Sequence, residues 1–219
     1  MLYRLAQILF RIYFFVYHRI SIEGLGGLRK FLASRKNAPV ILAANHESYL
    51  DPPLVGMLFP GPLRFVAWDG LFKFRPFGVL IGALGAVPVS QQDKNSAASL
   101  LRDVINFIKD GFSVLIFPEG ERSPDGNMLP LSGGVSLISL KTGTPIVPVW
   151  IEGTFEAYPL FRLFPRPYRV SVTFGEAIFP EDLPDDMPDK ERRETLLDAL
   201  ERALKKMRKA AGKDSSDQL

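Results

Sequence analysis

Short apolar runs alternate with longer amphipathic segments along most of the chain. The apolar runs are bounded by Gly, Pro, Asn or Asp, which is typical of buried strands separated by turns. One run contains Pro88, which favours a sheet edge or a strand end. The predicted strands cover residues 40–44, 63–67, 85–89, 112–117, 145–151 and 168–174.

Helical spacing of apolar residues appears between these runs. A helix from residue 95 or 96 ends at Gly111, a second covers 132–141, and a charged amphipathic helix covers 190–210 and is expected to pack on the domain. The apolar segment 71–84 contains Pro and Gly and predicts a broken helix. Residues 21–39 are expected to be a connector that contains one short amphipathic stretch.

Strands that alternate with helices predict an α/β fold: a single domain with a mostly parallel central sheet flanked by helices. In such folds, functional sites lie outside the carboxyl ends of the strands. The polar segments that directly follow strands are therefore the first places to look for chemistry.

The first 20 residues have a different pattern. Arg4, Arg11 and His18 are spaced seven apart on an otherwise apolar segment, so they form one polar stripe of a helix. We expect an amphipathic helix that lies in a membrane interface with these residues at headgroup level. The central Arg11 argues against a membrane-spanning helix and against the unbroken apolar region of a signal peptide. The alternative is a helix that simply packs on the domain.

This pattern predicts two parts: an N-terminal amphipathic membrane-associating helix over residues 1–22, and one α/β domain over 23–212. A chain of 219 residues is long enough for one substantial core. An apolar content of 47%, 17 Phe and a net charge of +3 favour a membrane surface or a lipid ligand. The absence of Cys excludes thiolate metal sites, and two His make a His-rich site unexpected. Nucleic-acid binding is not expected, because the basic residues are dispersed.

The segment NHESYLD, residues 45–51, follows the strand at 40–44. Its His46 is placed at a strand end, and Asp51 precedes two prolines, as an N-cap of a short helix would. A neutral imidazole there could take a proton from a substrate hydroxyl, with the carboxylate fixing its tautomer. The alternative is a helix cap next to a hydrogen-bonded core histidine.

The segment FPEGERS, residues 117–123, ends the strand at 112–117 in the same way. Arg122 is a residue type that binds phosphate bidentately, Gly120 allows the backbone to come close, and Glu119 could fix the arginine or a glycerol hydroxyl. The alternative is a surface salt bridge on a turn.

Together with IVPVWIEG at 146–153, these two segments resemble the glycerolipid acyltransferase family, whose best-known members are the 1-acylglycerol-3-phosphate acyltransferases. The resemblance implies transfer of an acyl group from acyl-CoA or acyl carrier protein to a lysophospholipid hydroxyl, with 1-acylglycerol-3-phosphate as the favoured acceptor, in phospholipid biosynthesis. By the same resemblance, His46 is the general base and Asp51 its support, both catalytic, while Glu119, Gly120 and Arg122 bind the acceptor. It implies no metal and no cofactor, and a peripheral or monotopic position on the cytoplasmic face of a membrane.

Three departures from the family pattern leave the acceptor open. Glu121 stands where the family often has Thr, Gln91 lies where an arginine is common, and Trp68 lies where a lysine is common. One alternative is another acceptor, either a lysophospholipid with a larger headgroup or another hydroxylated lipid. The others are a non-catalytic peripheral lipid-binding protein and a hydrolase in which His46 activates water. The apolar residues of 71–84 are candidates to line an acyl-chain cavity, or equally to form core.

Overall fold

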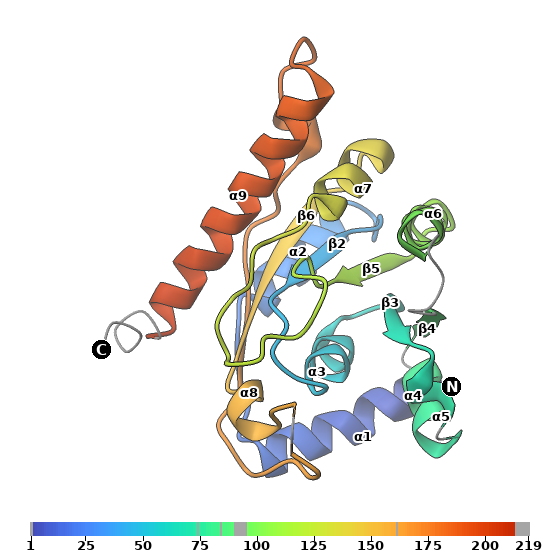
Figure 1. The fold of residues 1–219 in the computed structure, drawn as a ribbon, viewed down its shortest axis with the longest axis vertical. Helices are drawn as coiled ribbons and strands as arrows, with labels where there is room; N and C mark the ends of the chain where they lie inside the picture. The colour runs from blue at the N-terminus through green and yellow to red at the C-terminus, as the bar shows by residue number, and fades with distance from the viewer. Residues whose placement is uncertain (1, 74, 84, 90–95, 161, 213–219) are drawn as a thin grey trace.

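The computed structural model describes residues 2–73, 75–83, 85–89, 96–160 and 162–212 (Figure 1). The helices are α1 (Leu2–Tyr17), α2 (Leu25–Ser34), α3 (Asp51–Leu58), α4 (Gly70–Lys73), α5 (Arg75–Ala83), α6 (Ser96–Lys109), α7 (Gly134–Thr142), α8 (Thr154–Ala157), the 3₁₀ helix η1 (Pro180–Asp182) and α9 (Asp189–Ala210). The strands are β1 (Ser21–Glu23), β2 (Ile41–Ala44), β3 (Leu63–Trp68), β4 (Ala86–Val89), β5 (Ser113–Ile116), β6 (Ile146–Glu152) and β7 (Ser171–Phe174).

The described strands form one sheet in the order β1-β7-β6-β2-β5-β3-β4. Strands β2 to β6 run parallel to one another. Strand β7 is antiparallel to β6, and β1 is parallel to β7. The predicted α/β fold with a mostly parallel sheet is confirmed. Strand β4, which contains Pro88, lies at one edge of the sheet, as its sequence predicts.

Helices cover both faces of the sheet, so the central strands are buried on both sides (Figure 1). In β2, Leu42 and Ala44 pack with α1, α2, α3 and α5, whereas Ile41 and Ala43 face α6, α7 and α9. This two-sided burial explains why the strands appear in the sequence as continuous apolar runs.

Two expectations about the chain's course need correction. The connector predicted at 21–39 contains both β1 and α2, and β1 joins the sheet through the pairing of Ser21 with Ser171. The boundary predicted after residue 22 therefore falls within a strand. The broken helix predicted at 71–84 is present as α4 and α5.

Helix α1 packs on α3 through its polar side chains. The Gln7 side-chain amide donates hydrogen bonds to the carbonyls of Gly56 and Phe59, at 2.9 and 3.0 Å, and Arg11 Nε donates to Met57 O at 3.0 Å. These carbonyls lie at the C-terminal end of α3, where backbone oxygens have no partner within the helix. Two polar side chains of α1, Gln7 and Arg11, thus cap α3.

The inward position of the predicted polar stripe contradicts the expected placement of Arg11 and His18 at headgroup level. His18 is completely buried, with Nε2 3.0 Å from the Tyr13 hydroxyl, and burial lowers the pKa of its imidazole. Only Arg4 of the predicted stripe is exposed. The apolar side of α1 faces outward instead. Within the described ranges, no helix is long and apolar enough to cross a membrane.

Helix α9 packs on the opposite face of the sheet from α1. Leu196, Leu200 and Leu204 are buried, and the helix contacts β6 and α7. The expectation that this helix packs on the domain is confirmed.

Replacing Leu200 with Ala should lower the free energy of unfolding by about 2 to 5 kcal/mol, because it leaves a cavity where the side chain is fully buried. The matched change Arg202→Ala, on the exposed side of α9, should stay within about 0.5 kcal/mol of the parent protein. Denaturant unfolding followed by circular dichroism measures both. Equal effects of the two substitutions would contradict the packing of α9.

Candidate active site

Strands β2 and β5 are neighbours in the sheet, so the polar segments that follow them meet at its carboxyl edge. Asn45 fixes the end of β2: its amide nitrogen donates to Ile151 O at 2.8 Å, and its oxygen accepts from Ile151 N at 2.7 Å. The next residue, His46, is thereby placed at the end of a rigid strand. The Ser123 N–H donates to the His46 carbonyl at 2.8 Å, which ties the second segment to the first.

The His46 imidazole is hydrogen-bonded to a fully buried carboxylate. His46 Nδ1 lies 2.8 Å from Asp51 Oδ2, and the same oxygen accepts the backbone N–H groups of Glu47 at 2.7 Å and Ser48 at 2.8 Å. Since the carboxylate can only accept, the proton of this bond belongs to Nδ1. Nε2 is then left with a lone pair that can accept a proton.

Asp51 is not the helix cap that the sequence predicts. The N-cap of α3 is Leu50, and Asp51 is the first helical residue. Its carboxylate turns back toward the preceding turn and not toward the free N–H groups of the helix. Ser48, in the same turn, is buried and donates its hydroxyl to Tyr158 O at 2.8 Å.

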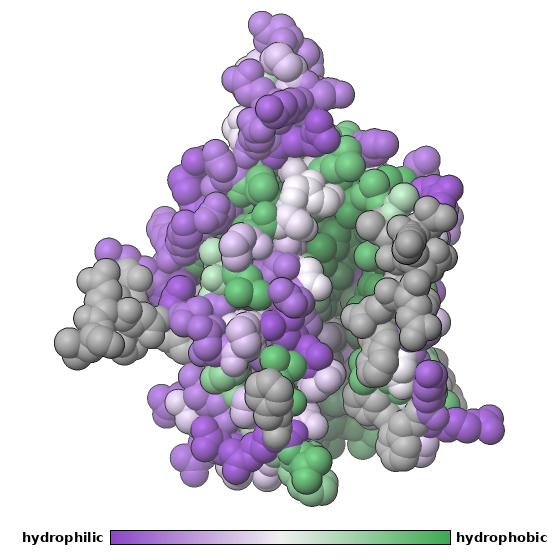
Figure 2. All heavy atoms as spheres, in the orientation of Figure 1, coloured by the Kyte–Doolittle hydropathy of each residue, from purple (hydrophilic) through white to green (hydrophobic). Residues whose placement is uncertain are grey.

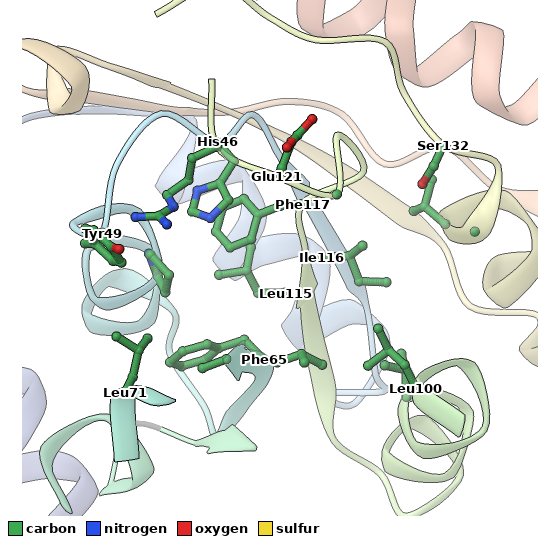
Figure 3. Close-up of a pocket in the computed structure, with 18 of the residues that line it drawn as sticks. His46, Tyr49, Phe65, Leu71, Leu100, Leu115, Ile116, Phe117, Glu121 and Ser132 are labelled. Atoms are coloured by element: carbon green, nitrogen blue, oxygen red, sulfur yellow. The ribbon is translucent and has the colours of Figure 1, made fainter. Parts of the chain in front are cut away.

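Phe117 holds the other side of the histidine. Its ring stacks on the His46 imidazole with centroids 3.9 Å apart and planes 18° from parallel (Figure 3). The histidine is thus fixed by a hydrogen bond at Nδ1 and by contact on a ring face. The sequence analysis did not identify Phe117 as a site residue, although it is the first residue of the FPEGERS segment.

Glu119, in the same FPEGERS segment, accepts hydrogen bonds from two backbone N–H groups. One carboxylate oxygen accepts the His46 N–H at 2.8 Å, and the other accepts the Leu129 N–H at 2.6 Å. Burial raises the pKa of Glu119 from 4.5 to about 7, the two backbone hydrogen bonds lower it, and the nearby charge of Asp51 raises it. With both oxygens engaged, Glu119 is placed to position the histidine and the following loop.

Gly120 and Arg122 face the open side of the site. Gly120 has a φ of 79°, a left-handed conformation that disfavours other residues, and an added Cβ would meet no atom within 4 Å. The Arg122 guanidinium lies 3.6 Å from the centroid of the Tyr49 ring, and its buried Nη1 has no hydrogen-bond partner among the described residues. Tyr49 was also not singled out in the sequence, although it lies inside the NHESYLD segment.

A cleft of about 900 Å³ opens beside His46 and Arg122. Most of its lining is apolar and comes from α3 to α7 and strands β3 and β5, as Figures 2 and 3 show. Of the segment 71–84, Leu71 and Ile81 line the cleft, whereas Val79 is 62% exposed; Phe74 and Leu84 lie outside the described residues. In the part of the chain that the structure describes, no three His, Cys, Asp or Glu side chains are grouped as metal ligands.

A comparison of the sequence with protein families finds a match that contains these segments. The profile of the acyltransferase family matches residues 20–152, which include both the NHESYLD and FPEGERS segments. The chain belongs to the acyltransferase family. The resemblance identified from the three sequence segments is therefore confirmed.

Several characterised proteins are similar to this acyltransferase. The chloroplast 1-acyl-sn-glycerol-3-phosphate acyltransferase of Brassica napus is 31% identical over 156 residues, covering 71% of this chain and 43% of the relative. The 1-acyl-sn-glycerol-3-phosphate acyltransferase of Bacillus subtilis is 25% identical over 194 residues, covering 86% of this chain and 92% of the relative. The chain thus spans less than half the length of the Brassica relative but most of the Bacillus one.

Among solved structures, the chain resembles the 1-acyl-sn-glycerophosphate acyltransferase of Thermotoga maritima, with a TM-score of 0.62 and 28% sequence identity. The match covers 86% of this chain and 72% of that one.

The raised pKa of Glu119 predicts a stability difference that depends on pH. Between about pH 4.5 and about pH 7, the folded protein binds a proton at Glu119 that the unfolded chain has released, so stability falls as the pH rises. The variant Glu119→Gln has no ionisable group at this position, so its stability lacks this decrease with rising pH. The stability of the parent relative to the variant should therefore decrease by about 2 kcal/mol across this window, once partial exposure is allowed for.

Denaturant unfolding at a series of pH values measures this difference. The matched control is Glu121→Gln, which makes the same chemical change at an exposed neighbour on the same segment. A difference between Glu119→Gln and the parent that does not change with pH would show that the Glu119 carboxyl ionises as an ordinary surface group.

Proposed function

We propose that this protein transfers a fatty acyl group from an acyl thioester to the free hydroxyl of 1-acylglycerol-3-phosphate. One observation carries the proposal: an imidazole fixed by a buried carboxylate lines the same apolar cleft as an arginine, one of whose nitrogens has no hydrogen-bond partner in the part of the chain that the structure describes. A base, a cation and an apolar cavity are what a hydroxyl, a phosphate and an acyl chain require. The names of the similar proteins support the same acceptor.

The proposed reaction begins with proton removal. His46 Nε2 takes the proton of the acceptor hydroxyl, and the Asp51 carboxylate stabilises the imidazolium that results. The hydroxyl oxygen forms a bond to the thioester carbonyl carbon, and the intermediate collapses as the carbon–sulfur bond breaks. The departing sulfur receives the proton from Nε2, so the histidine returns to its starting state. These steps need no enzyme nucleophile, and we propose that no resident metal or cofactor takes part.

Arg122 is the proposed contact for the acceptor's phosphate. Its planar guanidinium lies along the Tyr49 ring, which leaves the nitrogen atoms at its edge to form hydrogen bonds. Gly120 provides the unhindered backbone beside it. We assign Glu119 to positioning the site and not to direct contact with the acceptor, because backbone N–H groups engage both of its oxygens.

We propose that the reaction takes place at a membrane surface, with α1 in the interface. Its outward side chains are all more than half exposed and recur at helical spacing on one side: Leu5, Ile8, Leu9, Ile12, Phe15 and Val16. A helix with this exposed apolar side binds the boundary between headgroups and acyl chains. The acyl donor, acyl-CoA or acyl carrier protein, places the proposed site of action on the cytoplasmic face.

The variant His46→Ala should lower kcat for acyl transfer by about a thousandfold, because it removes the proton acceptor. Asp51→Asn should lower kcat by about a hundredfold or more, since the amide keeps an acceptor oxygen but loses the negative charge. The assay measures thioester consumption with detergent-dispersed lysolipids of several headgroups, and Lys190→Gln on α9 is the control.

Transfer to 1-acylglycerol-3-phosphate in preference to other lysolipids supports the proposed acceptor. A preference for a larger headgroup would overturn it. Release of free fatty acid without acceptor would identify a hydrolase. Absence of any thioester consumption in the parent protein would favour a lipid-binding protein.

A second variant pair tests the stacking of Arg122 on Tyr49. Tyr49→Leu removes the ring face and should raise KM for 1-acylglycerol-3-phosphate by about tenfold, while kcat changes little. Tyr49→Phe keeps the ring face and should stay within about twofold of the parent. KM for 1-acylglycerol, which lacks the phosphate, serves as the control and should not change in either variant. Identical effects of Leu and Phe on KM would contradict the role of the ring.

A further inference from the structure

The exposed apolar side chains of this protein are not spread evenly over its surface. Among the described residues, the large apolar side chains that are exposed lie on α1, on α5 at Val79, and in one segment between α8 and β7. In that segment Leu163 is 85% exposed and Phe164 is 77% exposed, compared with 78% for Val16, the most exposed of the large apolar side chains on α1. Figure 2 shows apolar atoms at the lower end of the molecule, where Figure 1 places α1 and the chain that follows α8.

The segment of residues 162–169, named here the arginine loop, is fixed to the end of α1. The Tyr17 hydroxyl of α1 donates to Pro165 O at 3.1 Å, across 148 positions of sequence. Two further hydrogen bonds hold the loop: the N–H of Arg166 donates to Ala157 O at 2.8 Å and that of Arg162 donates to Pro159 O at 3.1 Å. The loop is therefore attached to the domain at both ends of its apolar tip.

The charge of the loop fits an anionic lipid surface. Arg162, Arg166 and Arg169 are all exposed, and no acidic residue occurs between positions 157 and 175. Tyr168, also exposed, lies close to the Arg166 guanidinium at 5.8 Å from its ring centroid. Apolar tips surrounded by arginine and tyrosine are typical of segments that enter a headgroup layer, because each group meets its preferred depth.

We propose that the arginine loop is a second membrane contact, in which Leu163 and Phe164 enter the bilayer and Arg162 and Arg169 bind anionic headgroups. This inference rests on the proposed function for its first contact, the apolar side of α1. The hydrogen bond between Tyr17 and Pro165 places the two contacts on one side of the molecule. Contact at two separate points fixes the orientation of the protein on the membrane, which a single helix does not.

Vesicle co-sedimentation of the full chain tests the proposal, with phosphatidylcholine vesicles and with mixed phosphatidylcholine and phosphatidylglycerol vesicles. The double variant Leu163→Ser with Phe164→Ser should weaken binding to both vesicle types by about tenfold or more. Arg162→Gln with Arg169→Gln should weaken binding by about tenfold or more to the mixed vesicles only. The matched charge control is Lys190→Gln with Arg193→Gln on α9, at the opposite end of the molecule, and should bind as the parent does (Figure 1).

The proposal is overturned if the loop variants bind both vesicle types as the parent does. It is also overturned if the arginine variant loses binding to neutral vesicles as well. A loss of dimers by the Leu163 and Phe164 variant in sedimentation, without a loss of vesicle binding, would identify the loop as an interface between copies of the chain.

Failure of the proposed function is distinguishable from failure of this inference. Acyl transfer is measured in detergent micelles, where the loop variants should keep the parent's rate. Ile8→Ser with Ile12→Ser tests the contact made by α1 alone. Loss of vesicle binding in the loop variants supports the arginine loop whether or not the α1 variant or the transfer assay behaves as proposed.

Discussion

The structure around the site depends on one carboxylate oxygen, Oδ2 of Asp51, which accepts three N–H groups at once. Two come from the backbone of the turn after β2 and one from the imidazole of His46. These bonds give the turn its shape, start α3 in a defined direction, and select the histidine tautomer. An uncharged amide oxygen at this position would bind the three donors less strongly than the carboxylate does. The geometry of the turn and the chemistry of the histidine therefore have the same cause.

The sequence predicts the parts of this arrangement that are local. His46 and Asp51 are five positions apart, and the turn that joins them follows an apolar run of unambiguous strand character. The FPEGERS segment is recognisable for the same reason, and the carboxyl-edge rule for parallel sheets brings the two together. Most strands and helices are predictable as well, because burial on both faces makes the strands apolar throughout. Strand β1 is not, since three residues carry too little pattern.

What the sequence does not predict are contacts with backbone groups of distant residues. The family resemblance implies that Glu119 binds the acceptor, and its side chain could fix the arginine or a glycerol hydroxyl. The partners it has in the structure are N–H groups of His46 and Leu129, which have no signature in the sequence. The polar stripe of α1 was misplaced for a similar reason. Arg11 donates to the carbonyl of Met57, which is 46 positions further along the chain. A spacing of seven residues shows only that Arg11 and His18 lie on the same side of a helix, not which way that side faces.

Because the polar side of α1 is committed to the carbonyls of α3, the helix has no second orientation in which its apolar side is hidden. Turning it about its axis would remove the donors from the end of α3, and through that short helix would disturb the residue that supports His46. Folding therefore leaves the outward apolar side chains of α1 uncovered. A truncation that removed this apolar surface would at the same time leave the end of α3 without the donors of Gln7 and Arg11.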